Sequence, residues 1–298
     1  QMCIRDRLGG PQRQQQQQTD DGQRQPDEVF PVAGTEQRHR QRAYELDGQR
    51  LPMTKVMREF DQPDISFAPM PYGLQLTSLR PINDQITHTR VTNAIFPSTF
   101  VIPLSETMTI TQIHVPVDDT KNYWYAIFTS FDAPVDKEVM RNQRLEAVTL
   151  PDYIPKSGQH NNWGFSADEQ QSRTYLGMGE SDINVHDQWA CESMGAIQDR
   201  TREHLGTTDK VIMANRRNLI KAIETVQAGG TPPGVADSEI AAHRMGPDTV
   251  DGLAPTGGVE AWWRHAVQAK RDNAPWDAAL KPVAEPLAAE YSPHEEAS

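Results

Sequence analysis

The sequence predicts an α+β fold, in which a curved antiparallel β-sheet packs on a long C-terminal helix and a helical appendage follows. Two observations indicate the sheet and the helix. Strand-like segments follow one another from residue 61 with only short turns between them, and a long amphipathic segment comes after them. A third observation indicates the appendage, because Gly- and Pro-rich loops separate the last helix-like segments from the rest of the chain.

Thr, Val, Ile and aromatic residues dominate four consecutive segments, which we predict to be strands: 65–79, 85–96, 107–117 and 122–131. Apolar residues alternate along them, as at Ile113, Val115 and Val117. Turn sequences lie at 80–84 and 117–121. Because no helix-like segment separates these strands, we expect the sheet to be antiparallel.

Two helices are predicted after the strands. Residues 136–148 are charged with interspersed Ala and Leu, which is typical of a surface helix. Residues 186–200 place Ala190, Met194 and Ile197 on one helical face.

The clearest helix is predicted over 208–228, with Thr208 as its N-cap. Its apolar stripe is formed by Ile212, Leu219, Ile223 and Val226. Two glycines and two prolines follow at 229–233 and end the helix. Beyond residue 234, helices are predicted over 259–271 and 275–289, and we assign 236–298 to a C-terminal helical extension.

The first sixty residues differ in composition from the rest. They hold twelve glutamines, five of them consecutive at 14–18, without a helical or strand-like apolar period. Such a segment buries too little apolar surface to offset the entropy of ordering the chain, so we predict a disordered or artefactual leader over 1–60. Residues 2–7 also resemble the translation of a sequencing-library adapter, in which case Cys3 is not native and the start of the gene is missing.

Composition excludes several classes of partner and site. The net charge is −12 and the isoelectric point is near 5.2, which argues against a nucleic-acid or anionic-membrane surface. The most apolar stretch, 94–104, is far shorter than the roughly 20 residues of a membrane helix. Cys3 and Cys191 cannot form a disulfide framework or a four-thiolate metal site. We therefore expect a cytoplasmic protein with no nucleic-acid or membrane partner.

The common catalytic motifs are absent. The sequence contains no Gly-x-Gly-x-x-Gly, no phosphate-binding Walker loop and no Gly-x-Ser-x-Gly. Histidine pairs with metal-ligand spacing are also absent, since the nearest two, His186 and His204, are 18 residues apart. His88 and His114 lie in predicted strands, where we expect hydrogen-bonded or surface residues. His160, like His186 and His204, is of interest through its neighbours.

Charged residues are dense over 185–209, and Arg216 and Arg217 follow. The simplest interpretation is a structural network between two helix ends, formed by Asp199, Arg200, Arg202, Glu203 and Asp209. Asp187 is placed differently because it opens the predicted helix 186–200. Its carboxylate is expected either to cap backbone N–H groups or to turn into a cavity between helix and sheet as a metal ligand.

The motif block is long and specific. The sequence Glu-Ser-Met-Gly at 192–195 leads into Asp-Arg-Thr-x-Glu-His-Leu-Gly-Thr-x-Asp at 199–209, and Asp-Tyr-Ile-Pro at 152–155 and Asn-Asn-Trp-Gly-Phe at 161–165 precede it. This block resembles the C-terminal catalytic half of Rieske-type non-haem iron oxygenases, in the branch of phthalate 4,5-dioxygenase and dehydrodivanillate O-demethylase oxygenase subunits. The resemblance covers about 65–234, so we interpret 61–235 as a Rieske oxygenase catalytic domain that is incomplete at its N-terminus.

The resemblance implies a mononuclear Fe(II) held by two histidines and one carboxylate. By position, Asp187 matches the carboxylate ligand and is the predicted catalytic and metal-binding residue. Trp189 and Met194 would then pack their helix against the sheet. The family's Rieske [2Fe–2S] cluster needs two Cys and two His ligands, which the two cysteines here cannot supply. We expect that cluster, and both histidine ligands of the iron, to lie outside this chain.

Two functions remain open from the sequence. In the first, the parent protein hydroxylates or O-demethylates a carboxylated or methoxylated aromatic substrate with O2 and electrons from a ferredoxin or flavin reductase. Family electron transfer between neighbouring subunits then implies a homo-oligomer, commonly a trimer, and we expect the chain alone to be inactive. In the second, the chain is a non-enzymatic helix-grip module, like Bet v 1 and START domains, that binds an apolar ligand without metal.

Overall fold

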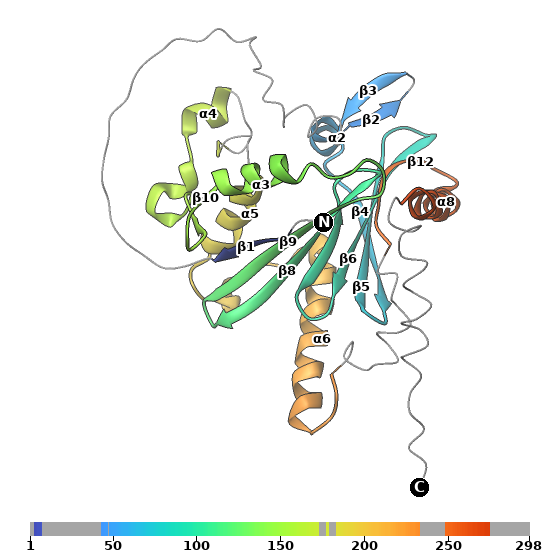
Figure 1. Cartoon of the computed structure of the whole chain (residues 1–298). Coiled ribbons are helices and arrows are strands. Elements are labelled where there is room, and N and C mark those ends of the chain that lie inside the picture. Colours follow the sequence, from blue (N-terminus) through green and yellow to red (C-terminus); the bar gives the residue numbers. More distant parts are fainter. Residues whose placement is uncertain are drawn as a thin grey trace, which may run out of the picture.

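The computed structural model describes residues 3–7, 43–46, 48–172, 177–178, 183–232 and 248–274. An eight-stranded antiparallel sheet is its main feature (Figure 1). Seven strands follow the order β1-β9-β8-β7-β6-β5-β4, and β12 pairs with β6. Their bounds are β1 Cys3–Arg7, β4 Asp64–Met70, β5 Gly73–Pro81, β6 Ile86–Ile95, β7 Thr99–Pro103, β8 Met108–Asp118, β9 Lys121–Ser130 and β12 Val250–Pro255.

The helices and minor strands surround this sheet. The α-helices are α2 Met53–Glu59, α3 Lys137–Glu146, α4 Ala167–Ser172, α5 Ile183–Glu192, α6 Lys210–Gln227 and α8 Val259–Asp272. Three 3₁₀ segments are η1 Gln159–Gly164, η2 Arg200–Arg202 and η3 Thr207–Asp209. Two small hairpins are formed by β2 Ala43–Leu46 with β3 Gln49–Pro52, and by β10 Val148–Thr149 with β11 Ile154–Pro155.

The predicted α+β class with an antiparallel sheet is confirmed, and the predicted strand 65–79 is in fact a hairpin. Strands β4 and β5 pair antiparallel across a turn that ends at Gly73. Gly73 has φ +142°, and a Cβ on it would lie 2.2 Å from the carbonyl oxygen of Ala94 on β6. Only glycine tolerates both the dihedral angle and the close approach of the neighbouring strand.

Strand β6 is the centre of the sheet because three strands pair with it. Strand β5 pairs along one edge of β6. On the other edge, β7 pairs with residues 93–95 of β6 and β12 pairs with residues 86–91. The C-terminal segment of the chain therefore completes the edge that β7 leaves open.

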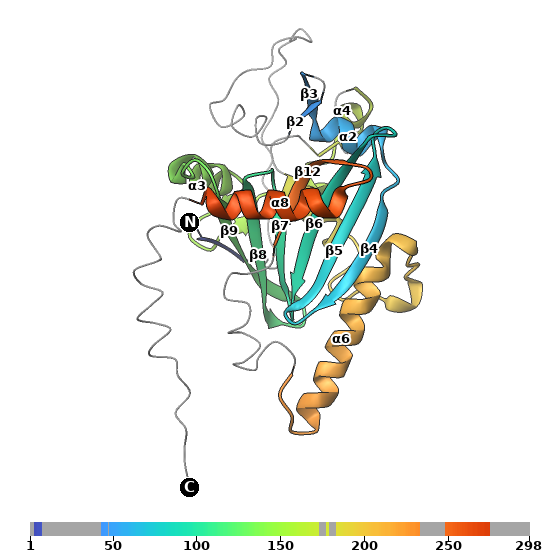
Figure 2. The same cartoon turned by 90° about the vertical axis from the view of Figure 1, so that its right-hand side faces the viewer.

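The sequence did not predict β7 or β12, since both are short and contain proline. Strand β12 also contains Gly252, which usually weakens a strand. Here the glycine is needed, because a Cβ on it would lie 2.7 Å from the indole of Trp262 on α8. Helix α8 lies across this face of the sheet (Figure 2), and Trp262 packs directly over the β12 backbone.

Helix α3 packs on the main hydrophobic core of the sheet. Asp136 is its N-cap and accepts hydrogen bonds from the backbone N–H groups of Glu138 and Val139. The core beneath it is formed by Met108, Ile110, Ala126 and Phe128, with Met140 of α3 packed against them. The predicted helix over 136–148 is thus present, within two residues at its C-terminal end.

Helix α6 agrees with the prediction in extent but not in burial. Thr208 lies in η3, and Asp209 occupies the N-cap position without a side-chain cap hydrogen bond. The buried residues of α6 are Ala214 and Ala222. Ile223, from the predicted apolar stripe, is 55% exposed, and Ile212 and Val226 are similarly exposed. Helix α6 contacts β5 but leaves most of its stripe at the surface of the described chain.

Residues 43–59 form the β2–β3 hairpin and α2, within which Tyr44 and Val56 are buried. The backbone of β1 pairs antiparallel with the edge strand β9. The division into 1–60, 61–235 and 236–298 stays a prediction. The structure adds that β12, from beyond residue 235, belongs to the main sheet. The helix predicted over 275–289 lies outside the described residues.

Candidate functional site

Asp187 lies in the middle of α5 and its side chain is exposed. The helix begins at Ile183, four residues before Asp187, so the carboxylate does not cap the helix N-terminus. The expectation that Asp187 opens a helix is therefore wrong, and capping is removed as an explanation for it. The next acidic candidates upstream, Glu180 and Asp182, lie outside the described residues.

The other end of α5 is fixed by a hydrogen-bonded cluster. The indole Nε1 of Trp163 in η1 donates to Glu192 Oε2 at 2.8 Å. Gln188 Nε2 donates to the same carboxylate at 3.0 and 3.1 Å and to the carbonyl oxygen of Ser157 at 2.9 Å. Helix α5 is thus tied to the 157–164 segment through residues on either side of one helical turn.

The pKa of the Cys191 thiol reflects the neighbouring charges on α5. Burial raises the pKa of its thiol, and the carboxylates of Asp187 and Glu192 raise that pKa further. Asp187 and Cys191 are four residues apart, which places them on neighbouring turns of one helical face. The charge of the Asp187 carboxylate is therefore felt one turn further along its own helix.

The predicted charge network is present in part. Glu203 accepts a bidentate pair of hydrogen bonds from Arg216 of α6 at 2.5 and 2.7 Å, which lowers the pKa of the carboxyl group. Asp199 accepts from the backbone N–H of Thr201 at 3.0 Å and caps η2. Asp209 accepts from the backbone N–H of Gly206 at 2.8 Å. The Glu203–Arg216 pair holds the motif block against α6, whereas Asp199 and Asp209 bond to backbone N–H groups of their own turns.

The apolar residues of the motif block are at the surface. Trp189 is 40% exposed and Met194 is 50% exposed, so the prediction that they pack α5 against the sheet is wrong. Ile197 is 71% exposed. Helix α5 ends at Glu192, and the residues from Ser193 to Gln198 form turns, so the predicted helical face through Ala190, Met194 and Ile197 does not form.

The histidines near the motif do not gather. His160 and His204 are exposed, and His186 is half-buried on α5. Among the residues that the structure describes, no three His, Cys, Asp or Glu side chains come together in a way that could hold a metal ion. The described part of the chain thus does not fit a complete three-ligand iron site, and Asp187 can offer such a site one oxygen ligand.

A buried polar cluster, which the sequence did not reveal, lies where β2, β6 and β12 meet. We call it the Asp251 cluster: Tyr44, His88, Arg90 and Asp251. The Tyr44 hydroxyl donates to Asp251 Oδ1 at 2.5 Å, and His88 Nε2 lies 2.8 Å from the same oxygen and 2.9 Å from the Tyr44 hydroxyl. Arg90 donates to Asp251 Oδ2. Since the phenol donates to Asp251, His88 Nε2 carries its hydrogen toward these two oxygens.

The centre of the Asp251 cluster is closed to solvent, and only the Arg90 side chain reaches the surface in part. His88 and Asp251 are both 0% exposed, and Nδ1 of His88 has no hydrogen-bond partner. Burial raises the pKa of Tyr44, and the Asp251 carboxylate raises it further. The expectation that His88 is hydrogen-bonded is confirmed. The sequence could not predict the rest of the cluster, because Asp251 lies 161 residues after Arg90. Only the pairing of β12 with β6 brings the two residues together.

A buried lysine lies on α8 beside the same strand. Lys270 Nζ donates to the carbonyl oxygen of Thr249 at 2.7 Å and lies 5.0 Å from the ring centroid of Phe131. Burial lowers its pKa to about 8. Glu106 is near it, and burial raises the pKa of that carboxyl group. The nearby carboxylates of Asp248, Asp251 and Glu106 act in the opposite direction on Lys270, so ionisable groups gather around β12.

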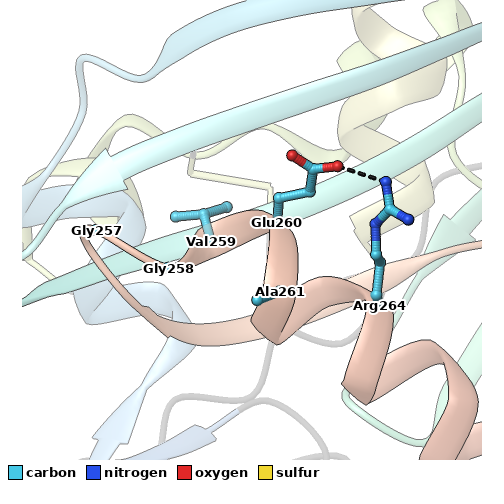
Figure 3. A pocket seen from close by; sticks show the side chains of 6 residues that line it. All are labelled: Gly257, Gly258, Val259, Glu260, Ala261 and Arg264. Carbon is cyan, nitrogen blue, oxygen red and sulfur yellow. Dashed lines mark hydrogen bonds and ion pairs between the residues drawn. The ribbon is translucent and has the colours of Figure 1, made fainter.

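One shallow pocket lies at the start of α8 (Figure 3), with a volume of about 370 Å³. The backbone of the turn at 257–258 forms one wall, and the exposed ion pair between Glu260 and Arg264, at 2.6 Å, lies beside it. It contains no member of the motif block. Among the described helices, none combines the length and apolar character needed to cross a membrane.

The family model described as "LigXa C-terminal domain like" matches residues 58–275. The chain belongs to this LigXa C-terminal-like family. The matched segment begins within α2 and includes every strand from β4 to β12 and helix α8. The Asp251 cluster therefore lies largely inside the family's own domain, and only Tyr44 precedes the match.

Two named relatives of this LigXa C-terminal-like chain are oxygenase subunits. It is 28% identical over 178 residues to the 3-chlorobenzoate-3,4-dioxygenase oxygenase subunit of Comamonas testosteroni, covering 53% of this chain and 41% of that protein. It is 26% identical over 176 residues to the phthalate 4,5-dioxygenase oxygenase subunit of Pseudomonas putida, covering 57% of this chain and 40% of that protein. The chain thus spans about two fifths of each relative, and the predicted resemblance to a Rieske oxygenase catalytic domain is confirmed.

Proposed function

We propose that this chain is the catalytic part of a Rieske-type mononuclear non-haem iron oxygenase that acts on an aromatic substrate. The observation that carries the proposal is the similarity to two oxygenase subunits of aromatic-ring dioxygenases. The motif block on α5, η2 and α6 supports it, because Glu203 and Arg216 hold that block in a defined position.

In this proposal, Asp187 supplies the one carboxylate ligand of Fe(II). A carboxylate with two neutral imidazoles and open coordination positions is the ligand set of non-haem iron oxygenases, in which bound Fe(II) activates O2. Helix α5 presents Asp187 on its exposed side, where its carboxylate can reach an iron ion held by residues of other elements. The two histidine ligands and the [2Fe–2S] cluster are not assigned to residues of this chain.

The relatives' names support an oxygenase of aromatic compounds, and the resemblance of the motif block adds O-demethylation as an alternative reaction. We infer hydroxylation or O-demethylation of a carboxylated or methoxylated aromatic compound, with O2 as oxidant and electrons from a ferredoxin or flavin reductase. A homo-oligomer, such as a trimer, would allow a cluster in one subunit to deliver electrons to an iron in the next. The cytoplasmic location stays a prediction.

Sequencing the genomic region upstream of this chain is the first test. We expect an in-frame Cys-x-His with a later Cys-x-x-His, followed by two histidines five residues apart. An in-frame start codon close to residue 1, without these motifs, would contradict the proposal and favour the helix-grip binding module.

The second test uses the longer protein. Asp187→Ala should abolish both iron retention and substrate turnover, measured by metal analysis and oxygen uptake, while Asp182→Ala should leave both unchanged. On the chain as given, we expect iron binding well below one equivalent, because a single carboxylate holds Fe(II) weakly. Full iron retention in Asp187→Ala would move the ligand assignment to Asp182 or Glu180.

A further inference from the structure

The segment before α5 has an unusual backbone. Asn162, Trp163 and Gly164 have φ values of +51°, +53° and +71°, so three consecutive residues lie in the left-handed region. Asparagine and glycine tolerate this region, whereas a bulky tryptophan rarely adopts it. A residue held there costs on the order of 1–3 kcal/mol, and it persists only where its surroundings fix it.

The hydrogen bonds around this turn supply that fixation. The backbone N–H groups of Asn161 and Trp163 both donate to the carbonyl oxygen of Gly158, at 3.1 and 2.8 Å. The Asn161 side chain accepts from the N–H of Gly158 at 2.9 Å and donates to the carbonyl oxygen of Lys156 at 2.9 Å. The turn is therefore rigid, and it holds Trp163 with its ring buried.

The buried indole has one polar atom, and that atom points at α5. Its Nε1 donates to Glu192, whose carboxylate also receives Gln188 from the preceding helical turn. Gln188 in addition donates to the carbonyl oxygen of Ser157. Two residues of α5, one turn apart, are thus tied to the rigid segment, and two such ties fix the rotation of a helix about its axis.

The rotation of α5 decides where Asp187 points. Successive residues of an α-helix are rotated by about 100°, so Asp187 lies roughly a quarter turn from its neighbour Gln188. A change in the tie at Gln188 and Glu192 therefore changes the direction of the Asp187 carboxylate. No residue of the tie needs to contact a metal or a substrate for this effect.

We propose that Trp163 and Glu192 are positioning residues, which set the rotation of α5 through their hydrogen bond and thereby aim the Asp187 carboxylate. The functional meaning of that aim rests on the proposed function. The hydrogen bond between Trp163 and Glu192 is present in this chain whatever its function. At this left-handed position the indole both fills the buried space and donates its N–H to Glu192.

The test compares variants of this chain by the rate of backbone amide hydrogen exchange in α5. Trp163→Phe removes the N–H and keeps an aromatic ring, and Glu192→Leu removes the acceptor. In both we expect about tenfold faster amide exchange over 184–192, because a hydrogen bond to a charged group is lost. Global unfolding, measured by urea denaturation, should change much less.

Two controls separate positioning from general loosening. Trp189→Phe makes the same substitution at an exposed position of α5 and should leave amide exchange unchanged. Glu192→Gln keeps an amide oxygen to accept from the indole and should restore at least half of the wild-type protection. If Glu192→Gln loosens α5 as much as Glu192→Leu, or if Trp163→Phe leaves α5 unchanged, the proposal is wrong.

The same variants in the longer protein distinguish this proposal from the ligand assignment. If both hold, Trp163→Phe lowers turnover and Glu192→Gln retains most of it. If Asp187→Ala retains iron and turnover while Trp163→Phe still loosens α5, the positioning tie stands and the ligand assignment fails. If Asp187→Ala abolishes iron retention while the α5 readouts are insensitive to Trp163→Phe, the ligand assignment stands and the tie fails.

Discussion

The Asp251 cluster and the motif block on α5, η2 and α6 both concentrate charge, yet their surroundings are opposite. Asp251 is fully buried, and its carboxylate is hydrogen-bonded to Tyr44, His88 and Arg90. The motif block exposes Asp187, and its apolar side chains Trp189, Met194 and Ile197 are also exposed. Much of the region that carries the family resemblance is thus exposed, whereas the fully buried carboxylate lies where the sequence shows no motif.

This difference indicates that the first region stabilises the fold and the second does not. A buried carboxylate with three partners holds strands together and offers no access to a substrate. An exposed carboxylate on a fixed helix adds little to stability, and solvent reaches it. Substitutions in the first region should therefore change the free energy of unfolding, and those in the second should change it little.

The largest effect is expected for Asp251→Asn. The change leaves Arg90 next to a neutral group, and breaking a buried ion pair costs about 3–5 kcal/mol of unfolding free energy. Urea denaturation followed by circular dichroism measures it. The matched control is Asp248→Asn, whose partner Arg271 is about one third exposed, as is Asp248 itself, and which should cost less than about 1 kcal/mol. Equal losses in the two variants would contradict the contrast between the regions.

Tyr44→Phe should have an intermediate effect. It removes the hydroxyl that donates to Asp251 at 2.5 Å and keeps the buried ring, which should cost about 1.5–3 kcal/mol, as expected for a hydrogen bond to a charged group. We also expect faster amide exchange over residues 43–52, because the β2–β3 hairpin is tied to the sheet by this phenol. Unchanged exchange there would show that other contacts hold the hairpin.

Lys270 should make stability depend on pH. Burial lowers its pKa to about 8, below the 10.4 of an unfolded lysine, so between these values the unfolded chain binds more protons than the folded one. Stability from this residue therefore rises from pH 8 to pH 10, by about 1 kcal/mol per pH unit. The Lys270→Met variant should lack this rise. The difference in unfolding free energy between wild type and variant should therefore change with pH, as measured by urea denaturation at pH 7 to 10. A rise of the same slope in the variant would assign it to other groups.

The smallest effect is expected for Ile223→Ser on α6. Ile223 is 55% exposed, so its replacement should change the free energy of unfolding by no more than about 0.5 kcal/mol. Thermal unfolding of the two proteins under identical conditions measures the difference. Ala222→Ser is the matched comparison at the adjacent buried position and should cost more. A loss above about 1 kcal/mol for Ile223→Ser would show that the stripe is covered in solution.

Local patterns predicted much of the fold. The strands β6, β8 and β9 and the helices α3, α6 and α8 follow from residue types and periodicity, but the predicted N-cap Thr208 lies in η3 and Asp209 takes the N-cap position of α6. The pattern could not say that Trp189 and Ile223 are exposed, because amphipathicity shows a face and not what covers it. Nor could it reveal β12, since pairing with β6 is a tertiary event.

The candidate site divides in the same way. Asp187 could be singled out only through the motif block, because a lone carboxylate carries no signal of its own. The tie between Trp163 and Glu192 spans 29 residues and requires a left-handed tryptophan, which no local propensity favours. The Asp251 cluster joins residues as far apart as Tyr44 and Asp251, and only the structure brings them together.

The two halves of one edge of β6 become occupied at very different times during synthesis. Strand β7 emerges directly after β6, whereas Asp251 emerges 161 residues after Arg90. At a translation rate of 5–20 residues per second, the edge at 86–91 waits about 8–30 s for its partner. An unpaired edge of this kind is a template for strands of other chains. A nascent chain should therefore need chaperone protection over that interval, and a C-terminally shortened chain should need it throughout. Pairing of β12 with this edge removes the template for aggregation.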